Sequence, residues 1–177
     1  MESGRRALVG DRDAFLKSPS AVIGDGDTVV LPDCPVPHFH HEAELGLVIG
    51  KTATRVNAED AFDYIFGYLN FIDVSARGLH ANSFLWGKSW DTFGPTGPYL
   101  VTADEVAAPL NLTVRLWVND DLRQDYNTSD MGHKIPRVIE WASAVTTLEP
   151  GDLIACGTNH QGLGAIQDND RMEIEIQ

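Results

Sequence analysis

Cysteine and long apolar runs are both scarce in this chain of 177 residues. The two cysteines, Cys34 and Cys156, lie far apart and form no C-x-x-C pair, which excludes a disulfide framework and a cysteine-built zinc site. Apolar runs such as Leu45–Ile49 are too short to span a bilayer, and Met1–Arg6 lacks the apolar core of a signal peptide. We therefore expect a cytoplasmic protein with no membrane partner.

Basic residues are also few: 13 Lys and Arg stand against 26 Asp and Glu, so the formal net charge is −13. Such a chain repels phosphates, which argues against a nucleic-acid partner. The acidic composition fits a protein that keeps carboxylates for a metal ion, and it equally fits a surface that is acidic for solubility.

Length and hydropathy indicate one ordinary globular domain, with 43% hydrophobic residues and a mean hydropathy of −0.16. No repeat, linker or low-complexity tract interrupts the sequence. We expect residues 1–13 to form a loose N-terminal arm and residues 14–177 to form a single domain.

Short strands dominate the predicted secondary structure, and no regular βαβ alternation occurs. The expected strands are Ala21–Ile23, Thr28–Leu31, His40–Ile49, Tyr68–Val74, Leu112–Val118, Leu153–Cys156 and Met172–Ile176. A hairpin turn is expected at Asn119–Asp121. One helix is predicted from Ala58 onwards, with Asn57 as its cap and Gly67 near its end, and a second over Ile135–Val145. The fold class is therefore α+β and mostly β, unlike a Rossmann sheet.

The most informative segment is His38–Gly46, which contains two glutamates two residues apart. On a strand, Glu42 and Glu44 point to the same face, about 7 Å apart. Two buried carboxylates repel each other, and a divalent cation removes that cost. An exposed acidic strand face is the other interpretation, but the apolar continuation of the strand argues against it.

Asp73 is a candidate for a third carboxylate, since it lies in an apolar stretch near a strand end. It could instead cap a turn or pair with Arg77. Three carboxylates form an oxygen-only site of the kind that Mg²⁺ or Mn²⁺ prefers. His38 and His40 share the parity of the two glutamates, so a zinc or iron site is a second possibility.

Two small-residue loops could contribute further polar groups. Gly87–Pro98 contains Lys88, which could face a carboxylate or an oxyanion, and it lacks the glycine spacing of a Walker A loop. Gly157–Gly164 follows a strand and could offer backbone N–H groups and the Thr158 hydroxyl to an anion. Each loop could also be an ordinary surface turn. No G-x-S-x-G motif or serine or cysteine triad is recognisable.

Taken in order, these segments resemble the fumarylacetoacetate hydrolase family over roughly residues 14–176. The matching segments are Phe15–Ser20, His40–Lys51, Asp63–Tyr68, Asp73–Arg77, Gly87–Pro95, Val118–Gln124, Thr147–Asp152 and Gly157–Thr158. The resemblance implies a mixed β-sandwich roll of the family's C-terminal-domain type.

The resemblance also implies a site and a chemistry. Glu42, Glu44 and Asp73 would bind Mg²⁺ or Mn²⁺, Arg77 and Lys88 would be catalytic and contact substrate, and Thr158 would bind substrate. Expected substrates are small anionic 2-oxo or 1,3-dicarbonyl acids. The expected reaction is acylpyruvate- or fumarylacetoacetate-type C–C bond hydrolysis through a metal-stabilised enolate.

Several alternatives remain open within this resemblance. The enzyme could be an isomerase, hydratase or decarboxylase of 2-oxo acids in aromatic catabolism, or a catalytically weak truncated homologue. No histidine precedes Phe15, where family hydrolases carry a general base, and Gly78, His80 and Asn159 depart from common family residues. The family habit, together with the aromatic residues Trp86, Trp90 and Trp117, predicts a homodimer.

Overall fold

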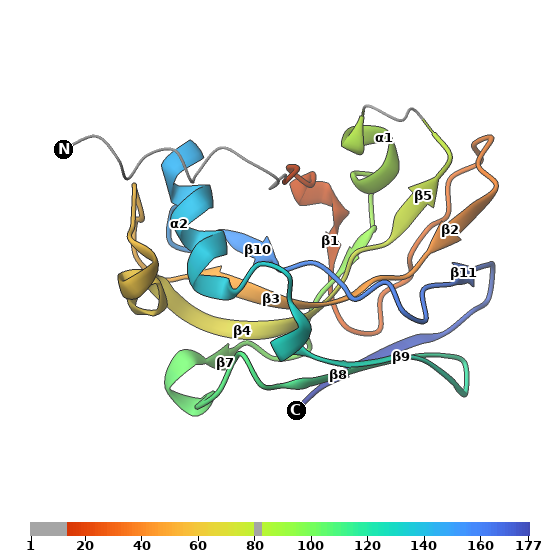
Figure 1. Cartoon of the computed structure of the whole chain (residues 1–177). Helices are drawn as coiled ribbons and strands as arrows, with labels where there is room; N and C mark the ends of the chain where they lie inside the picture. The colour runs from red at the N-terminus through yellow and green to blue at the C-terminus, as the bar shows by residue number, and fades with distance from the viewer. Residues whose placement is uncertain (1–13, 80–82) are drawn as a thin grey trace.

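The computed structural model describes residues 14–79 and 83–177, so the predicted arm 1–13 and His80 lie outside the described residues (Figure 1). Strands make up most of its regular structure. They are β1 (Val22–Ile23), β2 (His38–His40), β3 (Ala43–Ile49), β4 (Ile65–Ile72), β5 (Ser75–Arg77), β6 (Gly94–Pro95), β7 (Val101–Thr102), β8 (Thr113–Val118), β9 (Asp121–Asn127), β10 (Leu153–Ala155), β11 (Ala165–Ile166) and β12 (Met172–Ile176).

Helical segments are few and short. The α-helices are α1 (Phe84–Lys88) and α2 (Ile135–Val145), and the 3-10 helices are η2 (Pro19–Ala21), η3 (Ala58–Tyr64), η4 (Ala103–Glu105) and η5 (Thr128–Asp130). The described strands form four sheets, with orders β1-β6, β10-β3-β4-β7, β11-β2-β5 and β12-β8-β9. The mostly-β fold class is confirmed.

The antiparallel pair β3 and β4 forms the centre of the fold, from Ala43 opposite Ile72 to Ile49 opposite Ile65. Six of the seven residues of β3 are buried, which confirms that this strand is interior. Its branched side chains suit a strand covered on both faces.

At one end of this pair, both strands connect directly to strands of another sheet. β2 leads into β3, and β4 leads into β5, while β2 and β5 pair with each other at His40 and Ser75. The two crossing points are joined by the Asp73 N–H, which donates to the Glu42 carbonyl at 2.8 Å. The predicted continuous strand His40–Ile49 is therefore two strands, with Glu42 at the break between them.

Two apolar clusters form the core. In the first, Ile135 and Ile139 of α2 pack against Leu45 and Leu47 of β3. Pro136 in the first turn of α2 needs no N–H partner there, and the predicted helix Ile135–Val145 is confirmed. In the second, the buried face of β8 packs beneath β3 and β4, as the lower sheet in Figure 1 shows.

Two local predictions are wrong. Thr28–Leu31 is not a strand, because its backbone pairs with no neighbouring strand among the described residues. The helix predicted from Ala58 is a 3-10 helix that ends at Tyr64, and Ile65 already begins β4. The helical spacing of Phe62, Ile65 and Phe66 is outweighed by pairing with β3, which leaves Phe62 and Phe66 partly exposed.

The predicted hairpin and final strand are confirmed. Asn119 turns between β8 and β9 with φ of 57°, a left-handed conformation that asparagine tolerates. β12 pairs with β8 along Met172–Ile176. Within the described residues, no helix has the length and apolar character needed to cross a membrane.

Candidate metal centre

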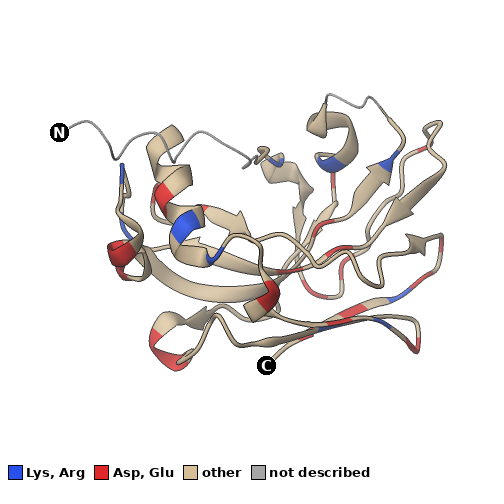
Figure 2. Ribbon diagram, viewed as in Figure 1, with Lys and Arg blue, Asp and Glu red and all other residues tan. Residues whose placement is uncertain are grey.

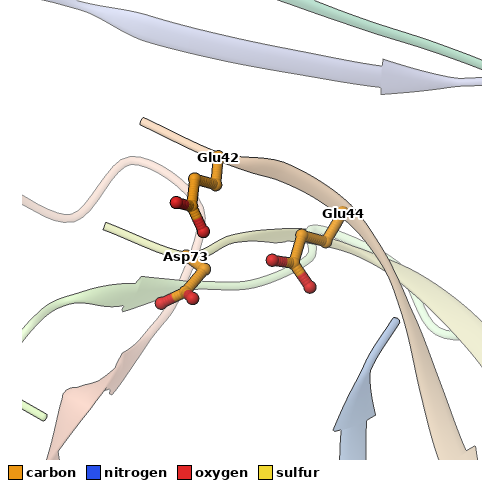
Figure 3. A group of neighbouring side chains, drawn as sticks. All are labelled: Glu42, Glu44 and Asp73. Atoms are coloured by element: carbon orange, nitrogen blue, oxygen red, sulfur yellow. The ribbon is translucent and has the colours of Figure 1, made fainter. Parts of the chain in front are cut away.

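Three buried carboxylates meet where the two sheets exchange strands. Glu42, Glu44 and Asp73 each place an oxygen within 4.8 Å of the others. Figure 3 shows Glu42, just before β3, and Glu44, on β3, both projecting toward Asp73, which lies between β4 and β5. Glu42 and Glu44 are two residues apart and point to the same side, and the Asp73–Glu42 backbone bond aligns the third carboxylate with them.

Lys88 at the end of α1 bridges two of the three carboxylates. Its Nζ lies 2.6 Å from Glu42 Oε2 and 2.6 Å from Asp73 Oδ2, and its side chain is 9% exposed. The same Nζ lies 5.4 Å from the centre of the Phe15 ring, which stacks on Phe84. In Figure 2 the blue end of α1 lies above red segments of the chain. Lys88 is thus a buried, oriented cation.

Arg77 of β5 is the second cation at the cluster. Its guanidinium donates to Glu42 and, through Nε, to His40 Nδ1 at 3.1 Å. His40 in turn stacks on His38 with ring centres 4.5 Å apart. Burial, followed by the charge of Arg77, lowers the pKa of His40 to about 4. The histidines therefore contact Arg77 and each other, and the potential ligand group within the described residues contains neither of them.

Lys17 is a third cation that the sequence analysis did not select. It precedes η2, and its Nζ donates to Asp73 Oδ1 at 2.6 Å and also to the Lys88 carbonyl. Burial lowers the pKa of Lys17 even though Asp73 opposes that shift. The signal available in the sequence was one lysine inside the otherwise uncharged segment Phe15–Ser20. Three cations therefore face three carboxylates.

The two glutamates have opposite pKa shifts. Burial alone would raise the pKa of Glu42, but Lys88 and Arg77 outweigh it and lower that pKa. Glu44 is ion-paired with no cation among the described residues, and burial together with the charges of Asp73 and Glu42 raises its pKa to about 8. Its Oε2 accepts the Gly157 N–H at 2.7 Å. Glu44 thus lacks the charge compensation that Glu42 has.

Thr158 lies next to this contact, in the loop that follows β10. Its Oγ1 accepts a hydrogen bond from Gln124 Nε2 at 2.9 Å. Gln124, a second residue that sequence reasoning missed, is buried on β9 opposite Leu116. A polar residue at an inward-facing position of a predicted hairpin was the signal for it. The structure therefore places Thr158 beside Glu44, through Gly157.

The donor set suits a hard divalent cation. All three groups supply oxygen and all are buried. Burial, followed by the repulsion between the carboxylates, raises the pKa of Glu44, so a cation placed among them would be stabilised. Mg²⁺ and Mn²⁺ both match this chemistry, whereas zinc and iron sites usually include nitrogen or sulfur ligands.

The stability of the metal-free protein should fall with rising pH because of Glu44. Its pKa is about 8 in the folded protein against 4.5 as the reference, so between these values the folded state binds more protons than the unfolded state. That contribution is fully present below pH 4.5 and disappears as pH rises through 8. His40 has a lowered pKa, so its contribution makes the protein more stable as pH rises from about 4 to 6.5. We expect a loss of about 1–2 kcal/mol between pH 6.5 and 8.

Urea unfolding with a chelator present measures this effect. The difference in unfolding free energy between wild type and Glu44→Gln isolates Glu44, because the other titrating groups are common to both proteins. As pH rises, the unfolding free energy of Glu44→Gln should increase relative to that of wild type. Parallel pH profiles for the two proteins would contradict the assignment to Glu44.

Comparison with known proteins places this fold in a family. The model of the fumarylacetoacetate (FAA) hydrolase C-terminal domain matches residues 3–177. The chain belongs to the fumarylacetoacetate hydrolase family, and its β-roll is the fold of that family's C-terminal domain.

Three relatives show the range of the family. The chain is 41% identical to oxaloacetate tautomerase YisK of Bacillus subtilis, over 92% of this chain and 56% of that protein. It is 47% identical to maleylpyruvate hydrolase of Sphingobium sp. SYK-6, whose crystal structure with manganese(II) and pyruvate superposes with a TM-score of 0.87 over 96% of this chain and 62% of that one. For the 2-hydroxyhepta-2,4-diene-1,7-dioate isomerase of Mycobacterium marinum the identity is 40% and the TM-score 0.88, over 96% of this chain and 66% of that one. The chain thus spans less than two thirds of each of these three proteins.

Proposed function

We propose that the protein is a metal-dependent enzyme that acts on small 2-oxo or 1,3-dicarbonyl acids. The observation that carries this proposal is the cluster of three buried carboxylates within 4.8 Å of one another. Glu42, Glu44 and Asp73 would hold Mg²⁺ or Mn²⁺. The manganese(II) and pyruvate bound by a 47% identical relative support both the ion class and the substrate class.

The charges of the site argue for an anionic substrate. A divalent ion and three carboxylates sum to one negative charge, so an anionic substrate needs the cations Lys88 and Arg77 close by. When bound, the ion supplies Lewis acidity toward substrate oxygens. Lys88, held by the buried end of α1, would stabilise negative charge that develops on the substrate oxygen as an enolate forms. Arg77, with 31% of its side chain exposed, can reach the outer anionic end of the substrate.

The specific reaction we propose is hydrolysis of an acylpyruvate-type C–C bond, as the hydrolase relatives suggest. Enolisation without bond cleavage, as in a tautomerase or isomerase, is the second candidate. One observation favours it: the two histidines nearest the carboxylates are engaged elsewhere, His40 with Arg77 and His41 with Gln124. His41 Nε2 has no hydrogen-bond partner, but it is buried away from solvent water. Both reactions share the enolate.

Activity assays with added metal test this function. Chelator-treated protein should be inactive, and Mg²⁺ or Mn²⁺ should restore turnover of oxaloacetate or of an acylpyruvate. Tautomerisation of oxaloacetate without cleavage of acylpyruvates would select the second candidate. Absence of turnover and of metal-dependent pyruvate binding would overturn the proposal, and the catalytically weak homologue would take its place.

Replacing Thr158 by valine should mainly raise KM. The substitution removes the hydroxyl that we propose binds the substrate carboxylate, while leaving Lys88 and the three carboxylates in place. A neutral hydrogen bond of about 1 kcal/mol corresponds to a several-fold increase in KM with little change in kcat. Steady-state kinetics measure both constants, and Thr54→Val, at an exposed site away from the cluster, is the control. A fall in kcat with unchanged KM would contradict this role.

We also propose a cytoplasmic homodimer. Apolar side chains beside the cluster are exposed, among them Leu16 at 90%, Leu85 at 67% and Trp86 at 54%, and a second copy of the chain would cover such a surface. Trp90 and Trp117, the other two aromatic residues used to predict the dimer, are half-buried and contribute less to it. A monomeric mass by light scattering at micromolar concentration would contradict the dimer, and cell fractionation tests the location.

A further inference from the structure

Gln124 is a fully buried glutamine whose side-chain amide connects two parts of the candidate site. Its Oε1 accepts the Ala43 N–H at 3.0 Å and lies 3.1 Å from His41 Nδ1. Its Nε2 donates to Thr158 Oγ1 at 2.9 Å and to the Asn159 carbonyl at 2.8 Å. One end of the amide therefore contacts the start of β3, between Glu42 and Glu44, and the other end contacts the loop after β10.

The partners determine the orientation of this amide. The Ala43 N–H can only donate, and the Asn159 carbonyl can only accept, so the oxygen must face β3 and the nitrogen must face the loop. His41 Nδ1 then donates to the same oxygen, and burial lowers the pKa of His41 in agreement with a neutral ring. Both ends of the amide thus have partners that match their chemistry.

The loop of residues 157–164, called here the site loop, packs directly on β9, the strand that carries Gln124. A Cβ on Gly162 would lie 1.7 Å from the Arg123 carbonyl oxygen, and one on Gly164 would lie 1.8 Å from Arg123 Nη2. Arg123 and Gln124 are consecutive on β9, so the backbone of one and the amide of the next contact the site loop together. At its other end, the Gly157 N–H contacts Glu44.

We propose that Gln124 is a positioning residue, which holds the site loop at a fixed distance from the carboxylate cluster so that Thr158 can bind substrate. The inference rests on the proposed function for the identity of the ligand. Gln124 itself contacts neither the carboxylates nor the outer cations; it acts through the site loop on one side and through β3 on the other. Filling of the core alone is the competing interpretation, and it predicts a loss of stability throughout the fold and no selective effect on the site loop.

Amide hydrogen exchange tests the positioning role without any ligand. Gln124→Glu keeps the acceptor toward β3 and loses donors toward the site loop, so peptides covering residues 157–164 should exchange about tenfold faster while those covering β3 do not change. Gly162→Ala should produce the same local effect from the opposite side, by steric displacement. Gly132→Ala, where an added Cβ meets nothing within 4 Å, is the matched control and should change neither segment.

Binding measurements separate the two proposals. Calorimetry first measures the Mn²⁺ affinity and then the affinity of the Mn²⁺-loaded protein for pyruvate. We expect Gln124→Glu and the apolar variant Gln124→Met to keep Mn²⁺ affinity within about threefold and to weaken pyruvate binding about tenfold.

Each outcome decides one proposal. Wild-type protein that binds no pyruvate overturns the proposed substrate class, and hydrogen exchange then decides the role of Gln124. Exchange that is unchanged, or faster to the same extent in β3 and in residues 157–164, overturns the positioning role. Wild-type-like pyruvate affinity in both Gln124 variants also overturns it. If one variant fails to fold, the other carries the same comparison.

Discussion

Replacement of Lys88 by alanine is expected to lower kcat for a 2-oxo-acid substrate by about 10²–10³-fold, with a smaller change in KM. Its ammonium group lies 2.6 Å from both Glu42 and Asp73, and all three side chains are largely buried, so a substrate oxygen that enters the cluster meets this charge at short range. The interaction strengthens as negative charge develops on that oxygen, and an interaction of this kind acts mainly on kcat.

Two measurements distinguish this role from a structural one. Lys88 competes with a metal ion for the same carboxylates, so its removal should leave Mn²⁺ affinity unchanged or increase it, whereas collapse of the site would weaken Mn²⁺ binding. Lys51→Ala removes an exposed lysine just beyond β3 and should leave kcat unchanged. Turnover by Lys88→Ala at the wild-type rate would show that the charge of Lys88 is not used in the reaction.

The predictable parts of the fold are those that depend on local sequence. The eleven residues of α2 contain both its apolar stripe and the proline of its first turn. The helix can therefore be predicted without knowing its distant partners. The segment Ala58–Gly67 shows the opposite case. Its apolar spacing is helical, but β3 offers a continuous antiparallel partner from Ile65 onward, and that non-local pairing cannot be read from a window of local sequence.

The candidate site also contains a part that can be predicted from local sequence and a part that cannot. Glu42 directly precedes β3 and Glu44 lies on it, so their proximity follows from the geometry of one extended segment, and Asp73 is brought to them by the end of β4. Lys17 reaches Asp73 across 56 residues, and Gln124 reaches Ala43 across 81. Those contacts depend on how η2 and the β8–β9 hairpin pack against the central strands, which the spacing of residues within one segment does not encode.

Glu44→Gln is expected to reverse its effect on stability when metal is added. In the metal-free protein above pH 8, wild type has an ionised Glu44 beside Glu42 and Asp73, so the neutral amide should raise Tm by a few degrees. With Mn²⁺ at about 1,000 times its Kd, wild type gains about 4 kcal/mol from binding, which corresponds to a rise in Tm of about 10 °C. The variant should gain much less, because it has lost one of three charged ligands.

The same experiment gives the metal affinity. Residues that only support metal ligands cost about 10–100-fold in affinity when removed, so loss of a ligand should cost about 100-fold or more. Glu59→Gln, at an exposed glutamate on η3, is the charge-matched control and should follow wild type with and without Mn²⁺. The reversal requires that the repulsion in the free site and the affinity of the loaded site come from the same three carboxylates. Equal gains in Tm on Mn²⁺ addition for wild type and Glu44→Gln would therefore exclude Glu44 as a ligand.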